Sequence, residues 1–222
     1  MRYVWLFLAA VLMTLLTGCD RNRSTDKIGS EPAPPTAEVG VFEPAEAALG
    51  AVEGSELRVL TEPLVFTGRN GTKWTAPKGT LTDGASIPHA ALPLIGDRFD
   101  SRYLNAAIVH DAYSQTDNEL VTAEQYRRRS WQSTHRMFFD ACLTGGTPLL
   151  LAKTMYAAVL IGGPRWEVDR QEPSSGQNAR PTETQIRTMT ERCEQFINGS
   201  DPTPEEIETW VEDQRRELMC PE

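Results

Sequence analysis

Residues 148–161 constrain the fold more than any other segment, because they are apolar on nearly every face of a helix. A helix without a polar side has to be enclosed, either by the rest of a protein or by lipid. This segment is only fourteen residues long, contains Lys153 and ends at Gly162-Gly163, so it is too short to span a bilayer comfortably. We therefore expect a buried helix in the core of a folded domain.

The segments around this helix predict a small mixed domain. Residues 57–60 and 64–67 have the composition of strands, and a returning strand is expected at 72–75, after the turn signal Gly68-Arg69-Asn70-Gly71. Asn-Gly favours a hairpin because both residues tolerate a positive φ. The expected fold class is mainly α (α+β), with an N-terminal β-hairpin packed on a helical core and a C-terminal helical extension. Further helices are expected at 102–114, 122–143, 183–197 and 204–219, with a short one within 41–54.

The N-terminus predicts export and lipidation. Arg2 supplies a positive charge, and residues 4–16 form an apolar run of signal-peptide length. Leu16-Thr17-Gly18-Cys19 then resembles the bacterial lipobox, whose cysteine is acylated and becomes the mature N-terminus. The alternative is an ordinary buried helix. The resemblance implies a lipid on Cys19 that anchors the chain to a membrane, facing the periplasm in the cell envelope, and Asp20 favours the inner membrane.

The composition divides the rest of the chain. Residues 1–18 are the expected signal peptide, and residues 19–54 are the lipidated cysteine with a flexible tether rich in Ser, Thr, Pro and charge. The folded domain is expected over 55–166. A polar linker and an acidic helical extension occupy 167–222, where a solvated helix is the simplest interpretation.

The charge limits the partners. The formal net charge is −9, so we expect no nucleic-acid partner. Arg127-Arg128-Arg129 is the one basic run, and it is either a solvated helix face or a site for anionic lipid headgroups. The expected partners are the membrane, through the lipid anchor, and either a phospholipid substrate or an envelope protein. Cys142, Cys193 and Cys220 could form one disulfide in an oxidising compartment, and the sequence does not select the pair.

A cluster of polar residues could carry chemistry. The three histidines of the chain, His89, His110 and His135, all lie between Asp83 and Asp140. Adjacent residues on a helix point about 100° apart, so His110 could act as a base while Asp111 holds a metal. Tyr113 could brace either residue. Asp83 and the carbonyls around Gly84 suit a hard cation such as Ca²⁺. The alternative is a His110 that packs in the core with satisfied hydrogen bonds.

Two resemblances sharpen this cluster. The stretch from Leu57 to about Trp166 resembles a domain family of unknown function found in phages and bacteria. The residues that carry this resemblance are Thr82–Pro88, Ala106–Asp111, His135–Asp140 and Met155–Val159, followed by Gly162 and Gly163. Asp83-Gly84-Ala85-Ser86, Ala106–Asp111 and His135–Phe138 also resemble motifs of prokaryotic secreted phospholipase A2, with Ala85 and Ala107 where that family has cysteines.

The second resemblance implies a phospholipase A2-like helical core and a calcium-dependent acyl hydrolase. His110 would activate a water, and Asp83, Gly84 and Asp111 would hold Ca²⁺. The family's carboxylate behind the base is replaced here by His135, which weakens the base or marks a converted site. Three possibilities therefore stay open: an active or degenerate hydrolase, a non-catalytic envelope or phage-derived interaction protein, and a zinc site on His110, His135 and an aspartate, which lacks supporting motif spacing.

Overall fold

A computed structural model gives the structure of the chain, and it describes residues 40–85, 96–168 and 181–219. These residues belong to one compact unit, residues 37–222. The expected signal peptide, Cys19 and Asp20 lie outside the described residues, as do Ser86 to His89 of the polar loop.

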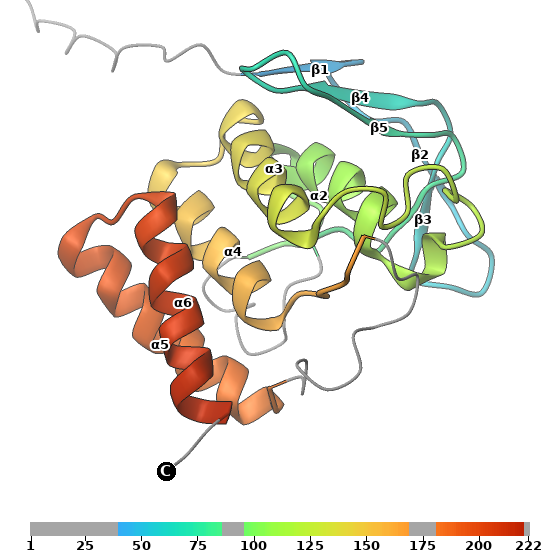
Figure 1. Cartoon of the computed structure of the whole chain (residues 1–222). Coiled ribbons are helices and arrows are strands. Elements are labelled where there is room, and N and C mark those ends of the chain that lie inside the picture. The colour runs from blue at the N-terminus through green and yellow to red at the C-terminus, as the bar shows by residue number, and fades with distance from the viewer. Residues whose placement is uncertain (1–39, 86–95, 169–180, 220–222) are drawn as a thin grey trace, which may run out of the picture. The chain divides into compact units, whose positions relative to one another are not determined.

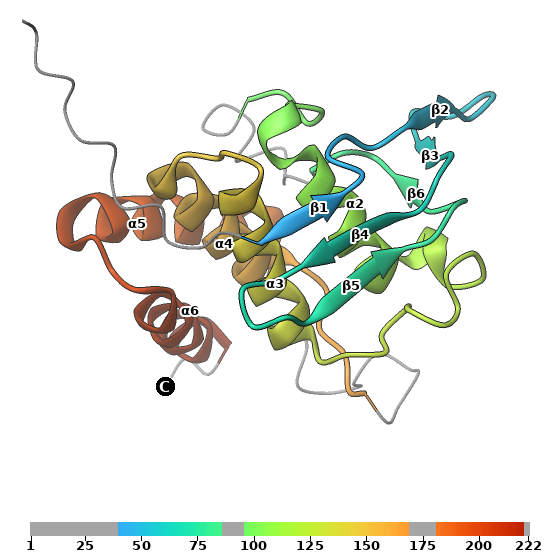
Figure 2. The same cartoon turned by 90° about the horizontal axis from the view of Figure 1, so that it is seen from above.

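The first sheet is built on a hairpin. Strands β4 (Leu64–Thr67) and β5 (Lys73–Ala76) pair antiparallel around the predicted turn, where Gly71 has a φ of 76°. Strand β1 (Val41–Glu43) pairs with the other edge of β4, giving the order β1-β4-β5 (Figure 2). Alternate residues of β4 and β5 are buried, which turns one face of this sheet to the core.

The second sheet is also three-stranded and antiparallel, in the order β2-β3-β6. Its strands are β2 (Leu49–Ala51), β3 (Arg58–Leu60) and β6 (Leu81–Thr82). Asn118 lies in the short 3-10 helix η1 (Thr116–Asn118) and fixes the edge strand β6. Its side chain accepts a hydrogen bond from the Leu81 N–H and donates one to the Leu81 carbonyl, both at 2.8 Å.

In the described part of the chain five α-helices follow the strands, and each begins where the sequence offers a cap or a proline. Asp100 caps α2 (Ser101–Ser114), and Ser130 caps α3 (Trp131–Thr144). Pro148 precedes α4 (Leu149–Gly162), Thr182 and Gln185 form a capping box at α5 (Glu183–Ser200), and α6 (Pro204–Met219) begins at Pro204.

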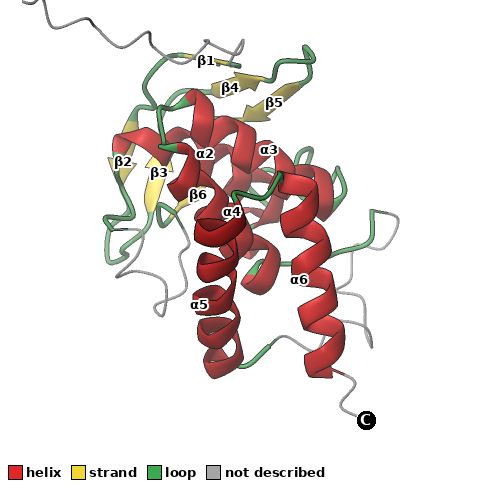
Figure 3. Ribbon diagram, turned by 90° about the vertical axis from the view of Figure 1, so that its left-hand side faces the viewer, coloured by secondary structure: helices red, strands yellow, loops and turns green. Residues whose placement is uncertain are grey.

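The helices pack one after another, starting from α2, which lies against the sheets. Helix α2 contacts β4, β5 and β6 on one side and α3 on the other, and α3 contacts α4 (Figure 1). Helices α5 and α6 both pack on α4 and flank it in the view of Figure 3. Most of α4 is therefore enclosed by protein, as its apolar sequence predicted. Among the described residues, no helix is long and apolar enough to cross a membrane.

The acidic helix α6 is docked, not merely solvated. Its row of glutamates meets side chains of α3, of α4 and of the segment after α4: Arg136 binds Glu205 and Glu208, Tyr156 donates to Glu208, and Arg165 binds Glu212. Arg215 adds a hydrogen bond of 2.6 Å to the Ile161 carbonyl oxygen at the end of α4. Spacing of three and four residues places these acids on one face of α6, while the buried side chains of Ile207 and Val211 join the hydrophobic core. The extension is therefore held by apolar burial together with ion pairs.

Several expectations about the fold are wrong. The chain has two small antiparallel sheets and five α-helices in its described part, instead of one hairpin on a phospholipase A2-like core. Residues 41–43 and 49–51 are strands, not a short helix, and they lie within the span expected as tether. The helix expected from residue 122 begins at Trp131, because Thr122 donates its hydroxyl to the Ala112 carbonyl oxygen and closes a turn there.

The described cysteines are not joined to each other. Cys142 and Cys193 are both free and buried, and Cys220 lies outside the described residues. Burial raises the pKa of both thiols, that of Cys193 to about 12, so both are held as neutral thiols.

Candidate functional site

A pair of buried histidines joins α2 to α3. His110 Nε2 lies 2.9 Å from His135 Nδ1, a hydrogen-bond distance. Aromatic rings surround the pair, with Phe138 against His110 and with Trp131 and Trp166 against His135. Only 7% of His110 and none of His135 is exposed, so the pair is sealed from solvent within the described structure.

A third polar side chain continues the pair. Ser114, one turn after His110 on α2, places Oγ 3.1 Å from His110 Nδ1 and donates to the His110 carbonyl oxygen at 2.8 Å. Within the described residues, His135 Nε2 has no hydrogen-bond partner, although it approaches the backbone at Gly163 and Pro164. Proline has no N–H, so the backbone group of Pro164 that this ring meets is the carbonyl oxygen, which attracts a ring proton.

The contact between the two rings needs one proton. One ring nitrogen donates and the other accepts, so His110 Nε2 and His135 Nδ1 share a single hydrogen. Ser114 gives its own proton to the His110 carbonyl oxygen. Two neutral imidazoles satisfy this arrangement, and two charged ones do not.

Both imidazoles are neutral near neutral pH. Burial lowers the pKa of His110 from 6.5 to about 4. Burial also holds the pKa of His135 well below 6.5, and charge on His110 and Arg165 lowers it further, against a smaller opposite effect of the Pro164 backbone. Charging either ring would place an ion in the core, which folding strongly disfavours.

Asp111 points into a different network from its neighbour. Its Oδ2 accepts a hydrogen bond of 2.6 Å from the Thr82 hydroxyl on β6, and its Oδ1 lies 3.9 Å from His110 Nδ1. Burial raises the pKa of Asp111 well above 3.8, and the charges of Asp83 and Asp117 raise it further, whereas Thr82 opposes them. The buried carboxyl group therefore joins α2 to β6 and resists ionisation.

The Asp83-Gly84 turn brings backbone, not metal ligands, together. Gly84 has a φ of 83°, and a Cβ there would lie 2.5 Å from the Arg98 carbonyl oxygen, so the turn requires glycine. Its N–H donates to the Thr82 hydroxyl at 3.0 Å. Asp83 faces the Arg98 guanidinium at 3.8 Å. Thr82 therefore links this turn to Asp111, because its hydroxyl accepts from the Gly84 N–H and donates to the Asp111 carboxyl group.

These residues do not fit the two metals considered. The described residues contain no group of three or more histidine, cysteine, aspartate or glutamate side chains that could hold an ion. Ca²⁺ takes six to eight oxygens, and here one carboxyl is hydrogen-bonded and resists ionisation while the other faces an arginine. Two nitrogens on one tetrahedral Zn²⁺ would lie about 3.3 Å apart, whereas His110 and His135 are bonded directly to each other.

Tyr113 belongs to the sheet contact of α2. Its hydroxyl oxygen accepts a hydrogen bond from the Thr75 N–H at 3.2 Å, and its ring lies edge-on to Trp74. The structure thus brings His110 and His135 together, places Asp111 beside them, and gives Tyr113 contacts on β5. The sequence interpretation placed Thr82 in a motif without giving it a role, and it missed Ser114 and Asn118, although the spacing of four residues from His110 to Ser114 was visible.

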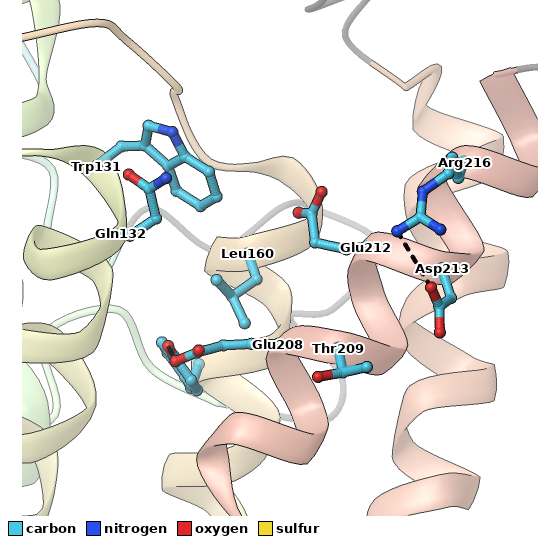
Figure 4. Close-up of a pocket in the computed structure, with 9 residues that line it drawn as sticks. Trp131, Gln132, Leu160, Glu208, Thr209, Glu212, Asp213 and Arg216 are labelled. Atoms are coloured by element: carbon cyan, nitrogen blue, oxygen red, sulfur yellow. Dashed lines mark hydrogen bonds and ion pairs between the residues drawn. The ribbon is translucent and has the colours of Figure 1, made fainter.

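Two described cavities lie apart from the histidine pair. One, of about 430 Å³, lies between α6 and the α3/α4 surface, where Glu212 extends toward Trp131 above Leu160 (Figure 4). The other, of about 350 Å³, lies between the β4–β5 turn and the first half of α3. The residues that line them do not include His110, Asp111 or His135.

The segment that contains the site matches the model of a protein family without an assigned function. Residues 58–159, from β3 into α4, match the model of a family described as "Protein of unknown function (DUF1353)". This segment contains Asp83, His110 and His135, so the expected relation to a domain family of unknown function is confirmed. Strands β1 and β2 and helices α5 and α6 lie outside the match.

Two relatives come from Sinorhizobium fredii (strain NBRC 101917 / NGR234). "Uncharacterized protein y4jT" is 32% identical over 152 residues, covering 64% of this chain and 42% of that protein. "Uncharacterized protein y4iH" is 36% identical over 109 residues, covering 49% of this chain and 41% of that protein. The matched part is thus less than half the length of either relative. No solved structure matches the chain. None of these matches is to a phospholipase A2 or a lipoprotein.

Proposed function

We propose that the chain is a lipid-anchored envelope protein whose central domain is non-catalytic and acts by binding. The observation that carries this proposal is the sealed, neutral histidine pair, in which the expected base and the group behind it are bonded to each other. The pair holds α2 to α3, and the neighbouring Thr82–Asp111 contact holds α2 to β6.

Catalysis by His110 meets two physical obstacles. A general base works best when its pKa lies near the operating pH, and burial lowers the pKa of His110 to about 4. A base must also reach the proton that it removes. His110 is 7% exposed, and both of its ring nitrogens already face hydrogen-bond partners at 2.9 and 3.1 Å. A structural role explains both features.

The anchoring part of the proposal rests on residues 1–20. The apolar run and the lipobox-like Leu16-Thr17-Gly18-Cys19 support acylation, and the polar segment that follows would let the domain work near a membrane. In cells grown with labelled palmitate, wild type should take up label and Cys19→Ala should not. Equal labelling of both proteins would contradict the anchor.

The non-catalytic part is tested on the purified full chain with short-chain phospholipid esters. We expect the same background hydrolysis with calcium, with chelator and in His110→Ala, while His110→Ala lowers the midpoint of thermal unfolding. Calcium should leave that midpoint unchanged. Calcium-dependent turnover that disappears in His110→Ala would refute a purely structural histidine pair.

A second candidate function is serine-dependent ester hydrolysis, favoured by the series Ser114, His110 and His135. Their spacings of 3.1 and 2.9 Å are those of a nucleophile, a base and an orienting group. Against it, Ser114 is 4% exposed and gives its proton to a backbone carbonyl. A fluorophosphonate probe separates the candidates: a hydrolase would be labelled in wild type and not in Ser114→Ala, and a binding protein in neither.

A further inference from the structure

We propose that the cavity between the β4–β5 turn and α3 is a binding site for a singly charged phosphate group, of the kind found in a phosphodiester. This oxyanion pocket is lined by Arg69, Arg129 and Arg136 around Asp140, with Phe66, Gly68, Asn70, Thr72, Trp74, Ser133 and Met137 completing the wall. The inference depends neither on the lipid anchor nor on the role of the histidine pair.

Arg129 is positioned as a ligand-binding side chain would be. Its guanidinium carbon lies 4.0 Å from the centroid of the Trp74 ring, and one N–H donates to the Lys73 carbonyl oxygen at 2.9 Å. Trp166 fixes the backbone below it by donating to the Arg129 carbonyl oxygen at 2.7 Å. The contact with Lys73 uses one of five guanidinium N–H groups, so a rigid, charged donor set remains on the cavity wall.

Arg69 supplies the second cation from the opposite side of the pocket. It is exposed on the turn between β4 and β5, which lies beside α3 in Figure 2. Arg136 also lines the pocket, but its terminal nitrogens bind Glu205 and Glu208 of α6. Arg69 and Arg129 therefore carry the charge available to a ligand, because neither forms an ion pair with a carboxylate among the described residues.

Asp140 sets the charge that the pocket can accept. Burial raises its pKa, against the lowering effects of Arg136 and Arg69. Arg69 and Arg129 face the carboxylate of Asp140 on this wall, and Glu205 adds a further negative charge nearby, so the pocket favours a monoanion over a dianion. Paired arginines bind phosphate oxygens in a planar, bidentate way. A volume of about 350 Å³ is large enough for a substituted phosphate such as a headgroup, not only a bare ion.

The test is isothermal titration calorimetry of the purified full chain with two soluble probes. Glycerophosphoglycerol is the deacylated diester of a lipid headgroup, and inorganic phosphate represents the free ion. We expect the diester to bind with one site per chain. Arg69→Gln and Arg129→Gln should each weaken its binding about tenfold, the loss typical of one charge-assisted hydrogen bond.

Asp140→Asn supplies the decisive arm, because it removes a like charge from the wall and should tighten binding severalfold, an effect that a merely structural role would not give. Arg128→Gln removes the same charge one residue from Arg129 but outside the lining and should change nothing. Arg129→Lys keeps the charge and should retain part of the affinity if Arg129→Gln unfolds.

The two probes identify the source of the phosphate. The same pattern of variants with the diester bound more tightly supports a headgroup, and the same pattern with inorganic phosphate bound more tightly supports a free phosphate ligand. No binding of either probe, or binding that is equal in wild type, Arg69→Gln and Asp140→Asn, would overturn the proposal.

Discussion

His110→Gln should change how the stability of the chain depends on pH. Glutamine keeps a polar group that can reach toward His135 but cannot be protonated. At about pH 8 the variant should be less stable than wild type, because a buried hydrogen bond at 2.9 Å is lost or weakened at a cost of about 1–2 kcal/mol. As the pH falls, wild type should lose this advantage, and the reason lies in proton binding.

The magnitude follows from the pKa of His110. An imidazole with a lowered folded pKa contributes stability above its ordinary pKa and loses it as the pH falls toward the folded value. Here the ordinary value is 6.5 and the folded value is about 4. At pH 5 the unfolded imidazole is mostly charged and the folded one mostly neutral. Linkage then destabilises wild type by about 2 kcal/mol relative to pH 8, and the variant does not share that loss.

Urea unfolding of both proteins at several pH values between 8 and 5 measures this difference. Comparing the two removes the contribution of Asp111, which is buried in both, and that of His135 changes only through the loss of the His110 charge, because burial is the main cause of its lowered pKa. The gap in unfolding free energy should shrink by about 2 kcal/mol between pH 8 and pH 5. Glu124→Gln, an exposed change, serves as the control and should run parallel to wild type. A constant gap across this range would show that His110 is not a buried neutral imidazole.

Three further substitutions test the packing of two glycines and the burial of Asp111. Gly145→Ala should lower the free energy of unfolding by about 1–3 kcal/mol, because a Cβ there would overlap a backbone oxygen of α2. Gly199→Ala, on the open side of α5, should raise it by about 0.5–1 kcal/mol. Thermal unfolding of both variants would detect either sign, and equal effects would contradict the close approach at Gly145. Asp111→Asn should stabilise the chain near pH 8, because the raised pKa of Asp111 makes its ionised form unfavourable in the fold. The stabilisation should disappear as the pH falls and the carboxyl group of wild type becomes protonated. A stabilisation that does not depend on pH would contradict the raised pKa.

Local signals predicted the elements that are stabilised locally. The Asn70-Gly71 turn and the strands on either side of it form the expected hairpin, and the apolar pattern of α4 gives the expected enclosed helix. Strand β1 was missed because its stability comes from pairing with β4, more than twenty residues away, and its own sequence is short. The start of α3 was misplaced because Ser130 competes with Thr122 as a cap, and tertiary contacts decide between them.

For the site, too, the sequence predicted the identity of the residues but not their environment. The sequence selected His110, His135 and Asp111 as one cluster, and the structure brings them close together. Sequence alone could not show that the two imidazoles would face each other in an aromatic enclosure, because this depends on how α2 and α3 pack. Burial is what turns a candidate base into a neutral hydrogen-bonding group. The sequence therefore identified the residues that could carry chemistry, but it did not show that they are buried from solvent.

The central claim is that His110 and His135 form a sealed neutral pair, and NMR of their ring nitrogens tests it most directly. The ¹⁵N shifts of the full chain, selectively labelled at histidine, report protonation and tautomer at each ring. Between pH 8 and pH 5 we predict two imidazoles that stay neutral, one donating and the other accepting in their shared hydrogen bond, while His89 serves as a third signal in the same sample. Titration of either His110 or His135 with a pKa at or above 6.5 would contradict the account.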